Sequence, residues 1–447
     1  TRLLEADHPS QVAGITRSQT DKLATAGIHT MTQLAQTSLS NVARLNANIL
    51  ERLKEQADLQ LRSKGLEKPL FRVIPAPPED AMRGLAGLPL PSSLDIFFDM
   101  EGYPHAEGGL EYLFGATYIV DGTPDFKAFW AHSQTEEKLA FEAFIDWVME
   151  RLDTDPTMHI YHYAPYEVTA MRKLMGKHAT REKEVDTLLR KEVFVDLYRV
   201  VREGLRVGEP SYSIKNLEHL YWKKREGDVQ DAGASIVEYY KWMQSGQSSD
   251  ISESPILAAI YDYNKDDCDS TLALCEWLRE QATNHGIQPA VPAIAADPTE
   301  APELSEEALE RQAIRERMLG STHKSNPDEA SEDERVHTLL MELLEFHRRE
   351  DKPIWWRMFD WIAKTPLELY DDADCIALLT RTEAPPVKVK RSTGFAYRFE
   401  PGQDTKLRDG SDVRLHEQDE IKGTVETLDL GKGELLLKLG GAALKKI

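Results

Sequence analysis

The chain has 447 residues and a formal net charge of −22, with 41% hydrophobic and 29% charged residues. This length is too great for one hydrophobic core and predicts two to four domains. No apolar run approaches the roughly 18–20 residues that span a bilayer, which argues against a membrane-spanning protein. Three cysteines without a CxxC pair favour a reducing, cytoplasmic setting and argue against a zinc site.

The acidic charge, taken alone, argues against a nucleic-acid partner. A nuclease, however, concentrates carboxylates to hold metal ions, so the acidity leaves a polyanionic substrate open. An acidic enzyme with a small-molecule substrate is the alternative. The chain begins at Thr1, without a Met or a signal peptide, and we therefore expect a processed chain or a piece of a longer protein.

Residues 1–62 are predicted to form a small helical module. Their apolar residues have the spacing of short helices around a tight turn at Gly27, and a longer helix is expected over residues 41–61. The module resembles a helix-hairpin-helix, in which a glycine turn lets backbone amides approach a phosphate. A helical packing domain is the equal alternative. Residues 63–91 are rich in Pro, Gly and Ala and are expected to form an extended linker.

Residues 92–284 alternate strand and helix patterns. The expected elements are strands at 94–102, 110–120 and 126–132, a helix at 135–152, a strand at 158–163, a helix at 165–175, a strand or helix at 193–201 and a long helix at 256–280. This order predicts a multidomain α/β chain whose central part is a ribonuclease H-like mixed sheet flanked by helices.

The remaining third of the chain changes character twice. Residues 285–335 are acidic and contain prolines, which predicts a linker with some helix. Residues 336–384 return to a helical pattern. Residues 385–447 have strand periodicity with turns at Asp409-Gly410 and Gly431-Lys432-Gly433, which predicts a β-barrel-like region.

The first chemical motif is the pair Asp99 and Glu101 in the predicted strand at 94–102. Residues i and i+2 of a strand point to the same face, so the two carboxylates lie side by side. Packing gives no reason for two adjacent anions in an otherwise apolar strand. Carboxylate oxygens are the ligands that Mg²⁺ or Mn²⁺ prefers, so a metal site is the functional interpretation. Such a pair is common, and an ordinary structural role is its alternative.

Two further motifs follow along the chain. Glu167 lies in the first turn of a predicted helix, where it either binds metal or is a favourable first-turn acid. Tyr263 and Asp267 are four residues apart in the last helix and share a face. A phenol one turn from a metal-binding carboxylate can orient an attacking water, whereas the alternative is a packed aromatic and a solvated acid. Asp266 is the competing acid, and its i+3 spacing fits less well.

The three motifs occur in the order found in the DEDD exonucleases. FFDMEG, HYAPYE and YNKDD resemble the motifs of this DnaQ-like superfamily, which includes polymerase proofreading domains. The resemblance implies that Asp99, Glu101, Glu167 and Asp267 hold metal and that Tyr263 places the domain in the tyrosine-bearing branch. The superfamily usually has Asp where this chain has Glu167, and the longer side chain leaves rate and metal preference open.

A closer resemblance is to YprB-like ribonuclease H-like domains, in which FDxEG, YHYxxYE and YNxDDCxxT recur. Such domains occur in proteins that join a RecB-like nuclease to a superfamily 1 helicase. The flanking segments GIT…AGIHTMTQLA, LEFHRREDKPIWWRMFDW and YRFEPGQDTKL…GTVETLDLGKGELLLKL resemble other parts of that family. This resemblance implies RecB-like and helicase partner domains. It also implies a role in DNA repair or antiphage defence. No GxxxxGK[ST] motor motif occurs in the chain, so we expect no ATP hydrolysis.

Several other residues are weaker candidates. Three of them fit substrate binding, each with an ordinary packing, capping or surface role as its alternative: His162, Asp196 and Lys215. Two pairs in the predicted helical segment fit base stacking or DNA contact, with core packing and salt bridges as alternatives: Trp355 and Trp356, and Arg348 and Arg349.

The resemblance of the three motifs to the DEDD exonucleases implies a 3′→5′ exonuclease that hydrolyses phosphodiester bonds with two Mg²⁺ or Mn²⁺ ions about 4 Å apart. Asp99 is expected to bridge the ions, and Glu101 and Asp267 to hold the ion that activates water. Glu167 adds a direct or water-mediated contact, and Tyr263 aligns the water. Single-stranded DNA is the expected substrate, with RNA open. The alternatives are a nucleic-acid-binding module with weak or no hydrolysis and an endonuclease that uses the same carboxylates.

Overall fold

The structure is a computed structural model, and it describes residues 2–78, 80–223, 232–289, 366–390, 392–401, 403–416 and 418–444, with single residues between 290 and 365. The chain divides into two compact units, one made of Thr1–Lys64 and Lys352–Ile447 and the other of Gly65–Asp351. Most of the predicted linker at 285–335 lies outside the described residues. So does about half of the predicted helical segment at 336–384, including Arg348, Arg349, Trp355 and Trp356. Among the described helices, none combines the length and the apolar character that a membrane span requires.

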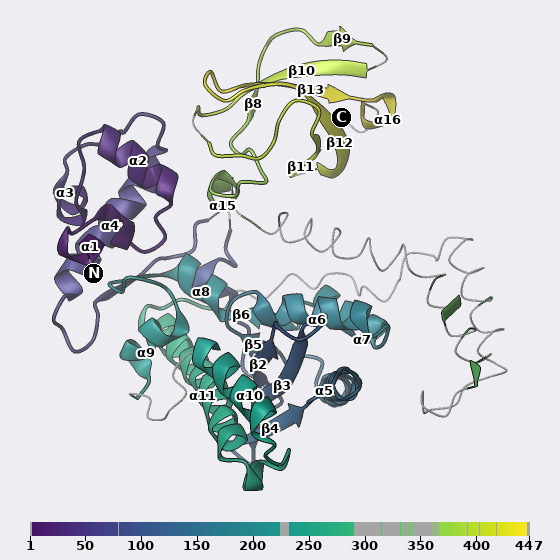
Figure 1. The fold of residues 1–447 in the computed structure, drawn as a ribbon. Helices are drawn as coiled ribbons and strands as arrows, with labels where there is room; N and C mark the ends of the chain where they lie inside the picture. Colours follow the sequence, from purple (N-terminus) through teal and green to yellow (C-terminus); the bar gives the residue numbers. More distant parts are fainter. Residues whose placement is uncertain are drawn as a thin grey trace. The chain divides into compact units, whose positions relative to one another are not determined.

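The Gly65–Asp351 unit is built on a five-stranded mixed sheet (Figure 1). The strand order is β4-β3-β2-β5-β6, in which β2 pairs antiparallel with β3 and parallel with β5. The strands are β2 Ile96–Tyr103, β3 Leu110–Val120, β4 Thr123–Trp130, β5 Ile160–His162 and β6 Phe194–Asp196. The predicted mixed sheet flanked by helices is confirmed. Because β2 is the central strand, its two carboxylates lie in the middle of the sheet.

Helices cover both faces of this sheet (Figure 1). The helices of this unit are α5 Gln134–Thr154, α6 Tyr166–Lys177, α7 Glu182–Arg190, α8 Leu197–Gly204, α9 Ile214–Tyr221, α10 Ala232–Ser245 and α11 Pro255–Asn284. Consecutive residues of β3 point to opposite faces. The side chain of Glu111 accordingly meets α6, whereas that of Tyr112 meets α10. The longest helix, α11, begins where the Ser254 side chain accepts a hydrogen bond from Leu257 N, with Pro255 in its first turn.

The structure contains elements that the sequence patterns did not indicate. Helices α7, α9 and α10 and strand β7, Leu205–Val207, lie in stretches for which no element was predicted. The segment expected to be a linker, 63–91, contributes strand β1, Phe71–Val73, which pairs antiparallel with β7. It also contributes a short 3₁₀ helix, η2 Gly84–Gly87, in which Leu85 is buried. Much of this stretch is therefore attached to the sheet domain.

The other unit begins with short helices. They are α1 Arg2–Glu5, the 3₁₀ helix η1 Pro9–Gln11, α2 Arg17–Thr25, α3 Met31–Gln36 and α4 Ala47–Ser63. Both α2 and α3 start with a capping box, formed by Thr16 with Gln19 and by Thr30 with Gln33. The helix predicted over residues 41–61 begins only at Ala47, because the Asn46 side chain accepts hydrogen bonds from two backbone amides of the first turn.

The same unit ends with an antiparallel sheet in the order β11-β12-β13-β10-β8, with β9 also paired to β10. Its elements are α15 Pro366–Tyr370, β8 Thr380–Arg381, β9 Val387–Val389, β10 Ser392–Arg398, β11 Asp412–Leu415, β12 Gln418–Asp429, β13 Glu434–Leu439 and α16 Gly441–Leu444. The sheet forms a half-barrel around a core that includes Ile421, Val425, Leu437 and Leu439. Leu369 and Tyr370 of α15 belong to the core of the N-terminal helices.

Candidate active site

Three carboxylates from two elements meet at the end of strand β2. Asp99 and Glu101 project from β2, and Asp267 projects from α11. One oxygen of each lies within 4.8 Å of the other two, so the three side chains could hold a metal ion. Glu101 and Asp267 are buried and Asp99 is partly buried. The competing acid, Asp266, does not belong to this group of described residues.

Neighbouring carboxylate charges raise the pKa of Asp99 and of Glu101. Burial raises the pKa of Asp99 well above its ordinary value, and the charges of Asp267 and Glu101 raise it further. Burial and the charge of Asp267 likewise raise the pKa of Glu101 to about 8. Such a group of anions is costly to bury unless a cation lies among them. An all-oxygen carboxylate set fits Mg²⁺ or Mn²⁺, because these hard cations prefer oxygen ligands.

The fourth predicted ligand, Glu167, lies in the first turn of α6 but outside the group of three. It is near enough for its charge to raise the pKa of Asp99. One of its carboxylate oxygens lies 3.3 Å from His162 Nδ1, and both side chains are buried. Burial lowers the pKa of His162, but the hydrogen bond and charge of Glu167 more than offset this and leave the pKa raised. His162 therefore contacts the fourth carboxylate.

Asp196 supports the loop between β5 and α6. Its carboxylate accepts a 2.8 Å hydrogen bond from Ala164 N and a 2.9 Å hydrogen bond from Tyr198 N, which caps helix α8. Ala164 has a φ of 71°, a left-handed conformation that a non-glycine residue seldom adopts. The hydrogen bond that Ala164 N donates to Asp196 holds this turn, and the turn leads into the helix that carries Glu167.

Lys215 and Tyr263 meet beside the carboxylates. Lys215 Nζ, from α9, donates a 2.9 Å hydrogen bond to Tyr263 Oη. The charge of Lys215 opposes the rise in the pKa of Glu101 that burial and Asp267 cause, without cancelling it. Burial and the charge of Asp267 raise the pKa of Tyr263 above its ordinary value, so its phenol stays protonated at neutral pH. This arrangement places a hydroxyl and an ammonium group next to the acids.

Asn264 is a buried polar contact that the motif analysis missed. Its side-chain amide in α11 donates a 2.8 Å hydrogen bond to Asp99 Oδ2. It lies against Gly115 of β3, which pairs with Asp99 in the sheet. Asn264 belongs to the YNKDD motif, and its place between Tyr263 and Asp267 was the signal in the sequence that could have indicated a role at the site.

Ser235 of α10 is a second missed contact. Its hydroxyl donates a 2.8 Å hydrogen bond to Glu101 Oε2, and Tyr112 Oη lies 2.7 Å from the same hydroxyl. The ring of Tyr239, one turn further along α10, stacks on Tyr112 with centroids 3.8 Å apart. Serine is too common for its position to have indicated this role, and the helix itself was not predicted.

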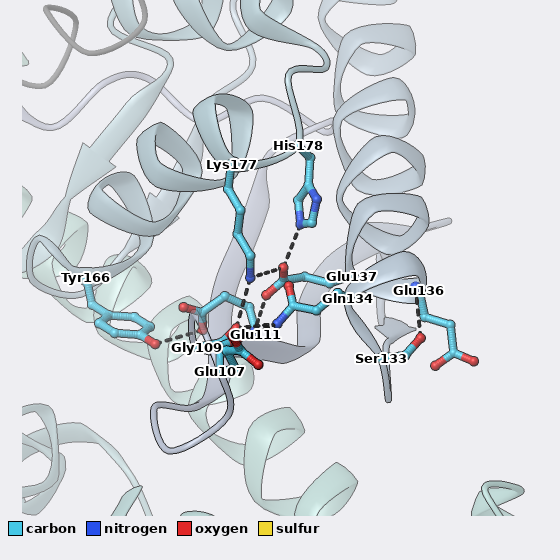
Figure 2. Close-up of polar contacts among 10 residues, drawn as sticks. All are labelled: Glu107, Gly109, Glu111, Ser133, Gln134, Glu136, Glu137, Tyr166, Lys177 and His178. Atoms are coloured by element: carbon cyan, nitrogen blue, oxygen red, sulfur yellow. Dashed lines mark hydrogen bonds and ion pairs between the residues drawn. The ribbon is translucent and has the colours of Figure 1, made fainter. Parts of the chain in front are cut away.

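A second cluster of polar groups fixes the other face of the sheet next to the site (Figure 2). Glu137 of α5 accepts hydrogen bonds from Lys177, from His178 and from the backbone N of Glu111. The Glu111 carboxylate in turn accepts a 2.8 Å hydrogen bond from Tyr166 Oη. These contacts tie α5, α6 and β3 together beside the end of β2.

The comparison with protein families agrees with this geometry. Residues 96–279 match the RNase_H superfamily model. No curated protein matches the chain. The match begins with β2 and ends within α11, so it spans all four predicted acids. This region has an RNase H-like fold. Nucleases with this fold act on phosphodiester bonds with divalent metals. The YprB-like subfamily, the RecB-like and helicase domains, and the repair or defence role stay predictions from the sequence resemblance.

Proposed function

We propose that the RNase H-like domain is a metal-dependent 3′→5′ exonuclease that degrades single-stranded nucleic acid, with DNA as the first substrate to test. The observation that carries the proposal is the convergence of Asp99, Glu101 and Asp267, with ligand oxygens within 4.8 Å of one another. The DEDD resemblance of the three motifs supports exonuclease chemistry, polarity and the role of Glu167.

Each acid has an expected part in this reaction. Asp99, on the central strand, would be shared by two metal ions, and Glu101 and Asp267 would complete one of the two sites. When bound, Mg²⁺ or Mn²⁺ would supply a water of lowered pKa and positive charge beside the leaving oxygen. Glu167, held beside His162, would reach the ions directly or through water.

The neighbouring side chains would position the reactants. The protonated phenol of Tyr263 accepts from Lys215 and is hydrogen-bonded to Asp267. Once a metal ion engages Asp267, this phenol would donate its proton to a water and orient it for in-line attack. The Lys215 ammonium would contact a non-bridging phosphate oxygen of the scissile bond. Hydrolysis would break the bond between phosphorus and the 3′ oxygen of the preceding nucleotide and release a nucleoside 5′-monophosphate.

The decisive experiment follows single-stranded oligonucleotides labelled at the 3′ or the 5′ end, in Mg²⁺ or Mn²⁺. The wild-type chain is compared with an Asp99→Ala/Glu101→Ala variant and with an Asp153→Ala/Glu150→Ala variant, whose two acids are exposed on α5. We expect shortening from the 3′ end by the wild type and by the α5 variant, and none by the β2 variant. RNA of the same sequence tests the sugar preference.

A circular single strand separates the two hydrolytic alternatives, because it has no end for an exonuclease to attack. Its cleavage would assign endonuclease activity to the same carboxylates. If wild type and β2 variant leave linear DNA and RNA equally intact in either metal, the exonuclease proposal is wrong. Retained oligonucleotide binding in that case would favour the nucleic-acid-binding module.

A further inference from the structure

Three tyrosines lie near the end of β2, two of them on the α10 side and one on the α6 side. Tyr103 lies on β2 one residue beyond Gly102, Tyr166 opens α6, and Tyr240 lies on α10. As whole residues, Tyr166 and Tyr240 are 48% and 50% exposed. Large aromatic side chains held at a fixed surface position beside a set of ligand carboxylates call for a partner, because a packed core does not account for them.

On the α10 side, the aromatic rings are arranged in parallel. Tyr240 stacks on Tyr103 with centroids 6.5 Å apart and ring planes at 15°. The imidazole of His105 contacts the edge of Tyr103, with centroids 5.5 Å apart. Helix α10 is anchored by the hydrogen bond from Ser235 to Glu101, little more than one turn before Tyr240. The stacked pair is therefore tied to the acidic cluster.

On the α6 side, Tyr166 is fixed by its hydroxyl while its ring stays exposed. Tyr166 Oη donates to Glu111, as Figure 2 shows, and this carboxylate lies against Gly102. A Cβ at Gly102 would come within 2.6 Å of Tyr166 Oη and 2.3 Å of Glu111 Oε2, so glycine permits the approach. The next residue after Tyr166 is Glu167, the fourth predicted ligand. The exposed Lys173 lies seven residues after Tyr166 on the same helix.

We propose that the stacked pair Tyr103 and Tyr240 on the α10 side of the end of β2, together with Tyr166 on its α6 side, form a tyrosine platform against which unpaired bases at the end of the substrate strand stack. The inference rests on the proposed nuclease function and adds to it a binding site for unpaired bases. Every base has an aromatic face, so such a platform tolerates any sequence and either sugar. It requires bases that are not paired. The substrate is therefore a single strand or an unpaired end, and a blunt duplex end is a poor substrate.

The test compares Tyr240→Ala and Tyr166→Ala with a control, Tyr118→Ala. Tyr118 pairs with Ile96 at the opposite end of β2 and β3, where its ring packs on Trp147. Binding of a fluorescent single-stranded oligonucleotide is measured by anisotropy in EDTA, which blocks hydrolysis. Stacking of one base is worth about 1–3 kcal/mol, or about fivefold to 150-fold in Kd. We expect each platform variant to weaken binding by at least about fivefold and Tyr118→Ala to change it less than twofold.

A hydrolysis assay separates this proposal from the proposed function. The second substrate is the p-nitrophenyl ester of thymidine 5′-monophosphate, which needs the acids but no strand. We expect Tyr240→Ala to raise KM for the oligonucleotide at least fivefold more than KM for the ester. An equal effect on both substrates, or unchanged anisotropy, would overturn the platform while leaving the nuclease in place.

Two controls complete the test. Tyr240→Phe and Tyr166→Phe keep the rings, and binding close to that of the wild type is expected for both. If these variants lose binding as fully as the alanine variants do, the hydroxyls and not the rings make the contact, and the stacking proposal fails. If the wild type hydrolyses neither substrate, the proposed function fails, and the anisotropy comparison still decides whether the platform binds strands.

Discussion

The side-chain amide of Asn264 donates a 2.8 Å hydrogen bond to Asp99 Oδ2, and Asn264 is fully buried while it does so. Gly115 makes room for this contact from the neighbouring strand. One oxygen of Asp99 is thereby held in place by α11, the same helix that supplies Asp267. The position of the central carboxylate thus depends on the close packing of helix against strand.

Gly115→Ala should disrupt this contact. The added Cβ would lie 1.7 Å from Asn264 Oδ1, so the amide must move away from Asp99. We expect a loss of stability of about 1–3 kcal/mol and metal affinity lower by about 10–100-fold. Urea unfolding and the metal dependence of hydrolysis measure the two effects. The control is Gly176→Ala in α6, where the new Cβ meets nothing within 4 Å. Normal metal affinity in Gly115→Ala would show that Asn264 does not position Asp99.

Removing one charge from the acidic cluster should stabilise the protein when metal is absent. Burial and mutual repulsion raise the pKa of Asp99 and of Glu101, and Asp267 contributes to both. We expect Asp267→Asn to raise the free energy of unfolding in EDTA by at least about 1 kcal/mol, the value of a one-unit pKa shift.

Metal should reverse this order of stability. Saturation at 100 times Kd stabilises a folded protein by about 2.7 kcal/mol, and we expect only the wild type to gain it. The measurement is urea unfolding with EDTA and then with Mg²⁺ or Mn²⁺, beside Glu150→Gln on the surface of α5. A variant that is less stable than the wild type in EDTA, or that gains as much from metal, would contradict the metal assignment.

Ser235→Ala should weaken metal binding through Glu101. The Ser235 hydroxyl donates a 2.8 Å hydrogen bond to Glu101 Oε2 and orients this carboxylate. Removing a contact that orients a metal ligand typically lowers metal affinity or activity by roughly 10–100-fold. We expect the Mg²⁺ concentration for half-maximal hydrolysis to rise about tenfold or more, with kcat at saturating metal much less affected. The matched control is Ser245→Ala at the exposed end of the same helix. A fall in kcat alone would assign Ser235 another role.

The sequence contained the ligands of the site but little of their support. Asp99, Glu101 and Asp267 could be predicted because strand periodicity puts the first two on one face and because the three motifs, in their order, resemble those of the DEDD exonucleases. The structure brings the three carboxylates together. The mixed sheet followed from the order of apolar strands and amphipathic helices. Helix α10 and the contact from Ser235 to Glu101 could not be predicted, since they depend on long-range packing against β2 and β3. The same holds for β1, where tertiary pairing with β7 decided the conformation of an apparent linker.

Lys215→Met should slow the chemical step. Lys215 Nζ donates to Tyr263 Oη at 2.9 Å and stacks over its ring, so the substitution removes the charge and keeps much of the packing. Loss of one preorganised donor from a reacting centre costs about 10²–10³ in kcat. We expect a fall of that size in single-turnover hydrolysis, with oligonucleotide Kd changed much less. Lys215→Arg should recover part of the rate. A change confined to Kd would make Lys215 a strand-binding residue only.

Glu137 should make the stability of the domain sensitive to acid. Its side chain is fully buried, which by itself raises its pKa, but hydrogen bonds from His178 and Lys177 and from the backbone of Glu111 lower the pKa below its ordinary value of 4.5. A carboxylate whose pKa is lower in the folded state than in the unfolded state stabilises the fold above the unfolded pKa. This stabilisation is lost as the pH falls through the folded pKa.

Glu137→Gln isolates this contribution. At pH 7 it leaves the Lys177 ammonium without its anionic partner, and we expect a loss of about 3–5 kcal/mol in the free energy of unfolding. The difference between wild type and variant should narrow as the pH falls below about 4.5, because protonation of Glu137 removes the same charge. Urea unfolding between pH 3 and pH 7 measures both trends. The exposed Glu150→Gln on the same helix serves as the control and should parallel the wild type. A wild-type advantage that stays constant down to pH 3 would show that Glu137 is not held as the charged form.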